Sequence, residues 1–476
     1  MRHSNNIIQF IKNYFQCRFH LLCSVSSVLI SLYAPLLNAQ ETVLDSYIEK
    51  ALAQNESFKQ AKLNVEIQNL NLVEARGNYY PSLSFNARYT VADGGRTIDF
   101  PLADLLHPVY NTLNQLTRSD QFSPLINNTE NVAFQFYRPQ EHETKLHLVQ
   151  PVYNRNIKLN YIIKKDLLEA ERNTINTHKL ALIAEVKTSY YSYLQAQEVL
   201  ELMQEISEVY AENVRVTKSL FENQKVTIDH FYAAHAELAR HSQKIVTARK
   251  NFNMSRSYFN FLIGEPFETE IKSGTAVQPD NQPHRIDSLQ ESALLNRPEL
   301  ETIRAYQSAK THEIATYKAN NMPSVAAVID YGFQGETYKF NKEQDFVLAS
   351  LVLQWELFKG FQNKAKVKKS LLEKQQLESR SNELKAQINL EIIQAYYELQ
   401  AAEESYLATE AETKAKEQAY EVINRKYIEG QTSILELTTA QSAYTTARQQ
   451  QIISRYDILI AMAKLEKAAG ITNYYQ

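Results

Sequence analysis

Three stretches of the chain contain neither glycine nor proline, and their apolar residues recur at a helical spacing. The stretches are residues 152–263, 361–429 and 431–469. In the second, the apolar series advances by threes and fours, close to the α-helical period; it is Leu384, Ile388, Ile392, Ala395, Leu399, Ala402 and Tyr406. A helix of about 65 residues would be roughly 100 Å long. The pattern predicts long helical hairpins that a compact globule cannot house.

The same stretch has a second apolar series on a neighbouring face, formed by Leu390, Ile393, Tyr397 and Ala401. A two-stranded coiled coil needs one seam with a period of about 3.5 residues. Two seams favour a ring or sheet of helices over a simple coiled coil.

Four other segments alternate apolar and polar residues with a period of two, as strands do. They cover residues 82–89, 145–148, 324–334 and 347–356. One apolar and one polar face is typical of a membrane barrel wall with a wet lumen, although a soluble sandwich gives the same alternation. Since the smallest closed membrane barrels have about eight strands, several chains would have to contribute to a barrel.

The two halves of the chain repeat each other. Residues 221–231 align without gaps with residues 427–437, an offset of 206, whereas Pro81 and Pro323 are 242 apart. The difference between 242 and 206 places about 36 extra residues in the first strand pair, at 93–142. We interpret them as a long loop, which contains Pro101, Pro108, Pro124 and Pro139; a short separate domain is the alternative.

The N-terminus has the features of a signal peptide. Arg2, Lys12 and Arg18 occur without an acidic residue, an apolar run covers residues 21–37, and cleavage is expected after Ala39. Both cysteines, Cys17 and Cys23, lie in this segment, and Cys23 lacks the small preceding residue of a lipidated cysteine. We therefore expect a mature chain with no thiol and no lipid anchor.

The expected organisation follows from these patterns. It is a signal peptide at 1–39; a first repeat at 40–262 with a helix, strands at about 81–93 and 143–154 around a loop at 94–142, and a hairpin turn near 223–228; a linker at 263–297; a second repeat at 298–470 with a helix, strands at about 323–335 and 344–358, and a turn near 428–433; and a tail at 471–476.

Composition and charge narrow the possible partners. The chain has 476 residues, 44% of them hydrophobic and 22% charged, with ten glycines, as expected of a folded, helix-rich protein. Removing three of the 51 basic residues leaves 48 against 54 acidic ones, a formal charge of −6, so nucleic acid is not an expected partner. No later run of 18 apolar residues occurs, so a membrane crossing would require strands.

Catalytic chemistry is not indicated. The chain has no glycine-rich phosphate loop, nucleophile elbow or His-Glu-x-x-His motif. His230, His235 and His241 are five and six residues apart, which rotates their rings away from one helix face, so we expect surface or lumen histidines and no metal. We predict a protein that is not an enzyme and has no cofactor.

Ser433-x-x-Glu436, just after Gly430, predicts a helix start with a capping box.

A duplicated unit of helix, strand pair and long helical hairpin behind a signal peptide resembles the TolC-like outer membrane efflux family over the mature chain. The residues that carry the resemblance are Asn55, Asn296-Arg297-Pro298, Pro81, Pro323, Trp355, Phe358, Gly360, Tyr427-x-x-Gly430, Leu437-x-x-Ala440-Gln441 and Leu465-x-x-Ala468-x-Gly470.

The resemblance implies an α+β membrane protein with an internal repeat. Four strands from each chain of a homotrimer would build one twelve-stranded β-barrel in the lipid of the bacterial outer membrane, continuous with a helical barrel across the periplasm. It implies a passive exit duct of a tripartite efflux or type I secretion system, joined by a periplasmic adaptor to an inner-membrane pump. A periplasmic coiled-coil spacer without a pore is the alternative.

The resemblance also suggests site residues. In the family, acids just after the second turn line the narrowest part of the tunnel, and Glu436 falls on such a position. Family members hold the tunnel end closed by polar links that include a tyrosine, an arginine and an aspartate. Here Tyr427 matches the tyrosine and Thr432 stands at the position of the arginine. The position of the aspartate is occupied by His230, with Asp229 beside it. We hypothesise a constricting ring of Glu436 and a hydrogen bond from Tyr427 toward Asp229. The turns would contact the adaptor through Asn223, Gln224, Lys225, Glu429, Gly430 and Gln431.

Overall fold

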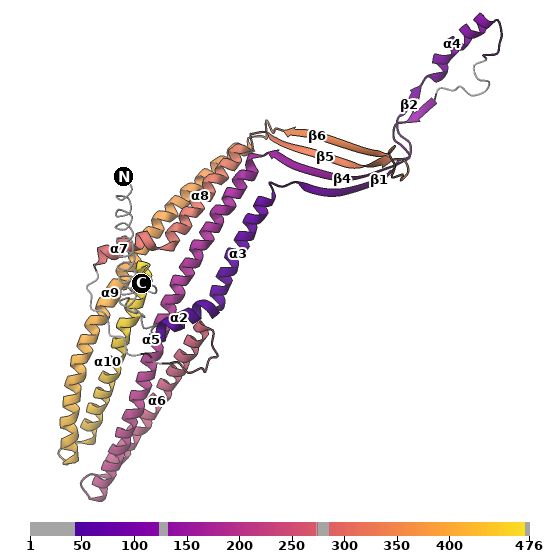
Figure 1. Ribbon diagram of the computed structural model, residues 1–476. Coiled ribbons are helices and arrows are strands. Elements are labelled where there is room, and N and C mark those ends of the chain that lie inside the picture. Colours follow the sequence, from indigo (N-terminus) through magenta and orange to yellow (C-terminus); the bar gives the residue numbers. More distant parts are fainter. Residues whose placement is uncertain (1–42, 123–131, 273, 275–284, 472–476) are drawn as a thin grey trace, which may run out of the picture. The chain divides into compact units, whose positions relative to one another are not determined.

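The structure, a computed structural model, describes residues 43–122, 132–272, 274 and 285–471 (Figure 1). The expected signal peptide, with its two cysteines, and residues 472–476 of the expected tail lie outside the described residues. By internal contacts the chain divides into two units. We call residues 63–174 and 299–384 the sheet unit, and residues 1–62, 175–298 and 385–476 the helix unit.

The sheet unit contains a four-stranded antiparallel sheet in the order β1-β4-β5-β6 (Figure 1). Its strands are β1 (Ser82–Val91), β4 (Gln140–Tyr153), β5 (Ser324–Gly335) and β6 (Asp345–Gln354). The register shifts between Pro151 and Tyr153, where proline has no N–H to donate to the ladder. Strands β1 and β6 form the two edges of this sheet.

The segment between β1 and β4 is more ordered than the sequence analysis expected. It contains a two-stranded ladder, β2 (Thr97–Phe100) with β3 (Val132–Gln135), and helix α4 (Leu102–Thr117). The expectation of a plain loop over 94–142 was therefore wrong, and β4 begins at Gln140. Pro101 occupies the N-cap of α4 and Pro108 lies inside it, so two prolines of the expected loop lie at the start of a helix and within it.

The helices of the two repeats correspond in length. They are α2 (Val43–Gln54) and α7 (Ile286–Asn296), α3 (Glu56–Gly77) and α8 (Pro298–Ala319), α5 (Arg155–Glu222) and α9 (Gln362–Ile428), and α6 (Ile228–Ile263) and α10 (Ile434–Ala469). Helices α5 and α9 have 68 and 67 residues, and α6 and α10 have 36 each. The expected combination of long helices with four strands in a sheet is confirmed.

The core of the helix unit joins segments far apart in the sequence. Its largest cluster packs α2 against α5, α6 and α10 around Ile48, Val186, Tyr190, Phe259 and Leu459. Tyr47 meets the Phe259 ring edge to face, with centroids 5.1 Å apart. None of the described helices is long and apolar enough to cross a membrane.

In both repeats a polar side chain holds the end of the last helix. The Asn55 side-chain amide donates to the Leu262 carbonyl at 3.0 Å, two residues before Gly264. In the second repeat, Arg297 donates to the Ala468 carbonyl at 3.0 Å, two residues before Gly470. Both glycines end their helices with positive φ, 74° and 70°. The structural counterpart of Asn55 is therefore Arg297.

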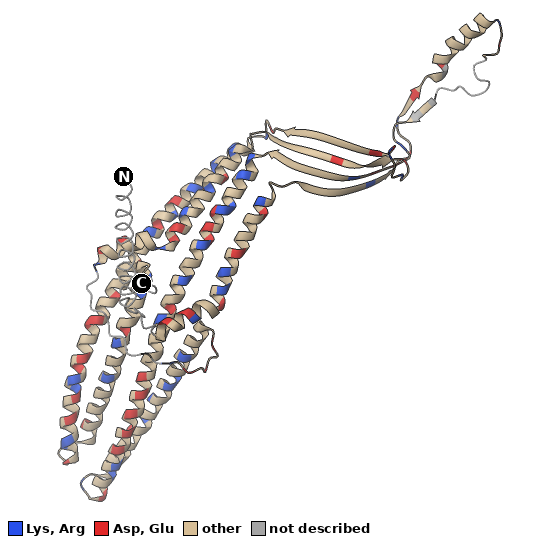
Figure 2. Ribbon diagram, viewed as in Figure 1, with Lys and Arg blue, Asp and Glu red and all other residues tan. Residues whose placement is uncertain are grey.

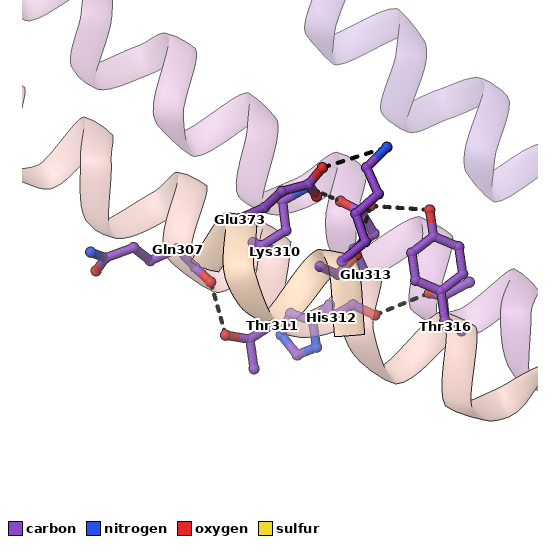
Figure 3. A network of polar contacts seen from close by, with 10 residues as sticks. Gln307, Lys310, Thr311, His312, Glu313, Thr316 and Glu373 are labelled. Carbon is purple, nitrogen blue, oxygen red and sulfur yellow. Dashed lines mark hydrogen bonds and ion pairs between the residues drawn. The ribbon is translucent and has the colours of Figure 1, made fainter. Parts of the chain in front are cut away.

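Polar contacts fix α8 against its neighbours within the sheet unit (Figure 3). The Lys310 ammonium lies 2.6 Å from a Glu313 carboxylate oxygen and 3.0 Å from Glu373 on α9. On another face of α8, the Ser308 hydroxyl donates to Asp166 of α5 at 2.9 Å. One short helix thus contacts both long helices through paired polar groups.

Candidate functional site

The first candidate surface is the four-stranded sheet, whose two faces differ in chemistry. Directly opposed residues across the strands, such as Leu83 with Leu148 and Ile329 with Ala349, form one apolar face. No described part of the chain covers this face: Leu351, for example, is 72% exposed. Figure 2 shows few charges on the strands, whereas the helices carry both signs along their length. An apolar sheet face of this kind suits contact with lipid.

Aromatic side chains gather at both ends of the sheet. At the end near the strand-connecting loops, Tyr338 stacks on His142 with centroids 3.9 Å apart and on Tyr89 at 6.3 Å. At the end near the helices, the Trp355 indole donates to the Asn321 carbonyl at 2.9 Å. Membrane barrels carry aromatic girdles at the two lipid–water interfaces, and this sheet has the same arrangement.

The opposite, polar face carries a chain of ion pairs across three strands. Asp330 of β5, 6% exposed, lies 2.5 Å from His147 Nδ1 and 3.1 Å from Lys145 Nζ, both on β4. Lys145 also contacts Glu143 at 2.9 Å, and Glu143 contacts Arg88 of β1 at 3.1 Å. The alternation placed Lys145, His147 and Asp330 on polar positions, but the sequence did not show that the strand register brings them together.

A glycine in β5 permits close packing against β4. A Cβ added to Gly332 would lie 2.3 Å from the Thr144 carbonyl oxygen and 2.6 Å from the Lys145 Cβ. No side chain fits at these distances without moving backbone. The sheet therefore requires glycine at this position.

The second candidate surface is the pair of helical turns, which have the same geometry in both repeats. After α5, Gln224 N–H donates to the Phe221 carbonyl and Lys225 N–H to the Leu220 carbonyl, both at 2.8 Å. After α9, Gly430 and Gln431 make the equivalent bonds at 2.9 and 2.8 Å. This is a Schellman motif, with Gln224 at φ 56° and Gly430 at φ 73° in its left-handed position.

The six residues expected to contact an adaptor lie on these two turns and are exposed; they are Asn223, Gln224, Lys225, Glu429, Gly430 and Gln431. Each turn is followed by a helix with an extended N-cap residue, Thr227 or Ser433. The two turns thus present similar backbone shapes with different side chains.

The left-handed residue of the two turns supplies a matched pair of substitutions. Gly430→Ala is expected to lower the free energy of unfolding by about 1 kcal/mol, because a Cβ is unfavourable at positive φ. Gln224→Gly should be neutral or raise it by less than about 1 kcal/mol, because it removes that strain. Denaturant unfolding followed by circular dichroism measures both, and equal effects of the same sign would contradict the Schellman assignment.

The start of α10 holds the predicted pore residue Glu436. The Ser433 hydroxyl accepts a hydrogen bond from the Glu436 N–H at 3.3 Å, as the capping motif predicts. The Glu436 carboxylate accepts a hydrogen bond from the Thr432 hydroxyl. Glu436 is exposed. Its carboxylate is therefore available to solvent while its backbone is capped.

The predicted partner of Tyr427 was wrong. Tyr427 is 1% exposed, and its hydroxyl lies 2.8 Å from the Thr217 hydroxyl of α5. The side chain points into a cluster with Ile434 and Leu437, whereas Asp229 is exposed. A hydrogen bond from the Thr227 hydroxyl, the largest cause, lowers the pKa of Asp229.

Thr217 is a residue that the sequence reasoning missed. It is fully buried and continues the helical series of Met203, Ile206 and Tyr210 on the packed face of α5. That spacing was available in the sequence. Thr217 is a polar residue at a position of this helical series where an apolar one would be expected, and its hydroxyl is the partner of the Tyr427 hydroxyl.

The three histidines differ in environment. His241 is 2% exposed, stacks on Tyr210 and donates from Nε2 to the Met203 carbonyl at 2.7 Å, so the expectation of a surface or lumen position was wrong for it. Burial lowers the pKa of His241. His230 is half-buried and His235 is exposed. Among the residues that the structure describes, no group of three or more His, Cys, Asp or Glu is placed to hold a metal ion.

Comparison with known proteins agrees with this architecture. Residues 289–471 match the family model of outer membrane efflux proteins. No curated protein matches the chain. The family match confirms the resemblance seen in the sequence and, with it, the expected outer-membrane location.

Solved structures extend the likeness beyond the matched segment. The Campylobacter jejuni outer membrane channel CmeC superposes with a TM-score of 0.73 at 15% identity, over 90% of this chain and 85% of that one. CusC, described as a transmembrane channel, gives 0.73 at 14%, over 90% and 92%. The Vibrio cholerae outer membrane protein VceC gives 0.71 at 14%, over 90% and 96%. At these identities the likeness establishes the fold.

Proposed function

Residues 289–471 belong to the outer membrane efflux protein family, and from this premise we propose that the whole chain is a passive exit channel of the outer membrane. The observation that carries the proposal is the sheet: one uncovered apolar face between two aromatic groups, with ion pairs on the other face. Lipid would contact the apolar face and water the polar face.

A homotrimer accounts for the two free edges of the sheet. Strands β1 and β6 lie at opposite edges and, in an antiparallel sheet of four, run in opposite directions. Strand β6 of one chain can therefore pair in antiparallel fashion with β1 of the next. Three chains supply twelve strands, and the closed barrel leaves no edge unpaired.

Uncovered helix faces also support association between copies. On α9, Ile388 and Ile392 are fully buried, whereas Leu390 and Tyr397 of the second apolar series are exposed. Helix α3 exposes an apolar series at helical spacing: Leu63, Ile67, Leu70 and Val73. Such faces favour neighbouring copies over solvent. We propose that they form the walls between subunits of a helical tunnel.

The channel has no energy source of its own in this proposal. We assign the energy to an inner-membrane pump, with a periplasmic adaptor between pump and channel. The matched family and the similar structures are channels, which supports transport and not catalysis.

Reconstitution tests the channel proposal. The purified protein should migrate as a heat-resistant trimer and give discrete single-channel currents in a planar lipid bilayer. A protein that gives neither would fit the alternative of a periplasmic spacer without a pore.

Glu436 is proposed to face the narrowest part of the channel. Glu436→Gln keeps an oxygen that can accept the Thr432 hydroxyl hydrogen bond, so the helix start should persist. Three negative charges would be lost from the trimer, and cation preference should fall clearly. Reversal potentials in a salt gradient measure this; unchanged selectivity would leave Glu436 with a role in the turn alone.

The two turns are proposed to bind the adaptor. A photo-activatable cross-linker on Asn223→Cys or Glu429→Cys should capture the adaptor in cells, because both positions are exposed on the turns. Glu268→Cys, in the expected linker region, is the control. Capture from Glu268 alone would move the docking site away from the turns.

A further inference from the structure

Helix α4 has an apolar face that no described part of the chain covers. Leu105, Val109 and Leu116 are 59%, 51% and 76% exposed. Their spacings of four and seven residues place them on one side of the helix. Strand β2 leads into α4 and exposes Ile98 and Phe100, which lie two apart and so on one face of the strand. Apolar surface thus continues from strand to helix.

The polar side of α4 carries little charge. Asp104 is the one acidic residue of the helix, which contains no lysine or arginine, and Arg118 follows at its C-cap. At about 100° per residue, Asn111 lies opposite Val109 and Gln115 lies about 120° from it, both away from the exposed apolar side chains. With so few charged side chains, this helix is not expected to attract a strongly charged partner. A helix of 16 residues that contains a proline, Pro108, has little stability by itself in water, so packing of its apolar side must contribute to its stability.

The nearest apolar environment follows from the chain connection. The apolar sheet face includes Val91, the last residue of β1, beside the aromatic group of Tyr89 and Tyr338. Residues 92–101 connect Val91 to α4, and ten residues span at most about 35 Å. If the sheet face contacts lipid, α4 is tethered within reach of the same membrane surface.

We propose that α4 lies in the outer surface of the outer membrane, with Leu105, Val109 and Leu116 toward the lipid acyl chains and Asn111 and Gln115 toward water. This inference rests on the proposed channel function. The insertion then acts as an amphipathic membrane anchor at the outward-facing end of the sheet. A lipid surface suits the helix better than a charged protein partner because its exposed face is apolar and its polar face is nearly uncharged.

Single-cysteine labelling tests the orientation. The two native cysteines precede the expected cleavage site, and residues 43–471 contain none, so Val109→Cys, Leu116→Cys, Asn111→Cys and Gln115→Cys each carry one label. The labelled proteins are reconstituted in vesicles of phosphatidylethanolamine and phosphatidylglycerol. A nitroxide on the lipid chain should quench an environment-sensitive fluorophore at 109 and 116 several-fold more than at 111 and 115, and aqueous iodide should show the reverse order.

Leu351→Cys on the apolar sheet face is the control that separates the two proposals. Quenching of a label at 351 by the lipid nitroxide, with equal iodide quenching at all four α4 positions, would overturn the α4 assignment alone. Absence of lipid quenching at 351 would overturn the channel proposal. Pyrene excimers between copies labelled at 109 would show that a second copy of α4, and not lipid, covers this face.

Discussion

Gly332→Ala is expected to abolish the heat-resistant trimer and the channel currents. The added Cβ would lie 2.3 Å from the Thr144 carbonyl oxygen and 2.7 Å from the Lys145 Cα, so backbone atoms of β4 must move. Overpacking costs about 1–3 kcal/mol, and this site is expected at the upper end of that range because backbone has to move. The displaced β4 would also shift Lys145 away from Asp330, 3.1 Å distant. Unheated gel electrophoresis and bilayer recordings measure the loss.

Gly335→Ala is the matched control in the same strand. The Cβ added there would meet the Gln344 side chain, which can rotate, and no backbone atom is among its nearest contacts. We expect this variant to retain trimers and currents. A Gly332→Ala protein that assembles like Gly335→Ala would show that β4 and β5 are less closely packed than described.

Arg297→Ala should lower the free energy of unfolding by about 3 kcal/mol. Arg297 is 5% exposed, and its guanidinium donates to the Ala468 carbonyl at 3.0 Å and to Glu391 at 3.0 Å. Its loss leaves buried acceptors at the end of α10 without a donor and removes a positive charge from a helix C-terminus. Denaturant unfolding of the protein in detergent, followed by circular dichroism, measures the effect.

Asn55→Ala tests the corresponding position of the first repeat. It removes the bond to the Leu262 carbonyl and the cap on the Phe58 N–H, 3.1 Å away, and should cost about 1–2 kcal/mol because both groups are neutral. We therefore predict that Arg297→Ala lowers the free energy of unfolding more than Asn55→Ala does. An Asn55→Ala loss equal to or above that of Arg297→Ala would show that the charge of Arg297 adds nothing.

The coarse fold was predictable because its signals are periodic and local. Gaps without glycine or proline marked α5, α6, α9 and α10, and alternation marked the four strands of the main sheet. Helix α4 was missed because Pro101 and Pro108 were interpreted as loop residues. Its apolar series, running from Leu102 to Leu116, was the signal that could have identified it.

The side-chain partners were harder to predict because they depend on how elements meet. A periodic pattern places Tyr427 and Thr217 on packed helix faces, but the register between two long helices decides that their hydroxyls come within 2.8 Å. The same holds for Asp330, whose two partners lie on another strand 183 and 185 positions earlier in the chain. Rotation and register are properties of the assembled structure.

Strands β1 and β6 have ten residues each, and in the proposed channel this length determines how well the sheet matches the thickness of the membrane. At about 3.4 Å per residue such a strand is about 34 Å long, and a tilt of about 40° reduces its height to roughly 26 Å. This is close to the apolar band of about 25 Å found on outer-membrane barrels. A thicker bilayer would have to thin around the protein, at a cost of fractions of a kcal/mol for each Å of mismatch. The strand length therefore favours residence in a thin membrane.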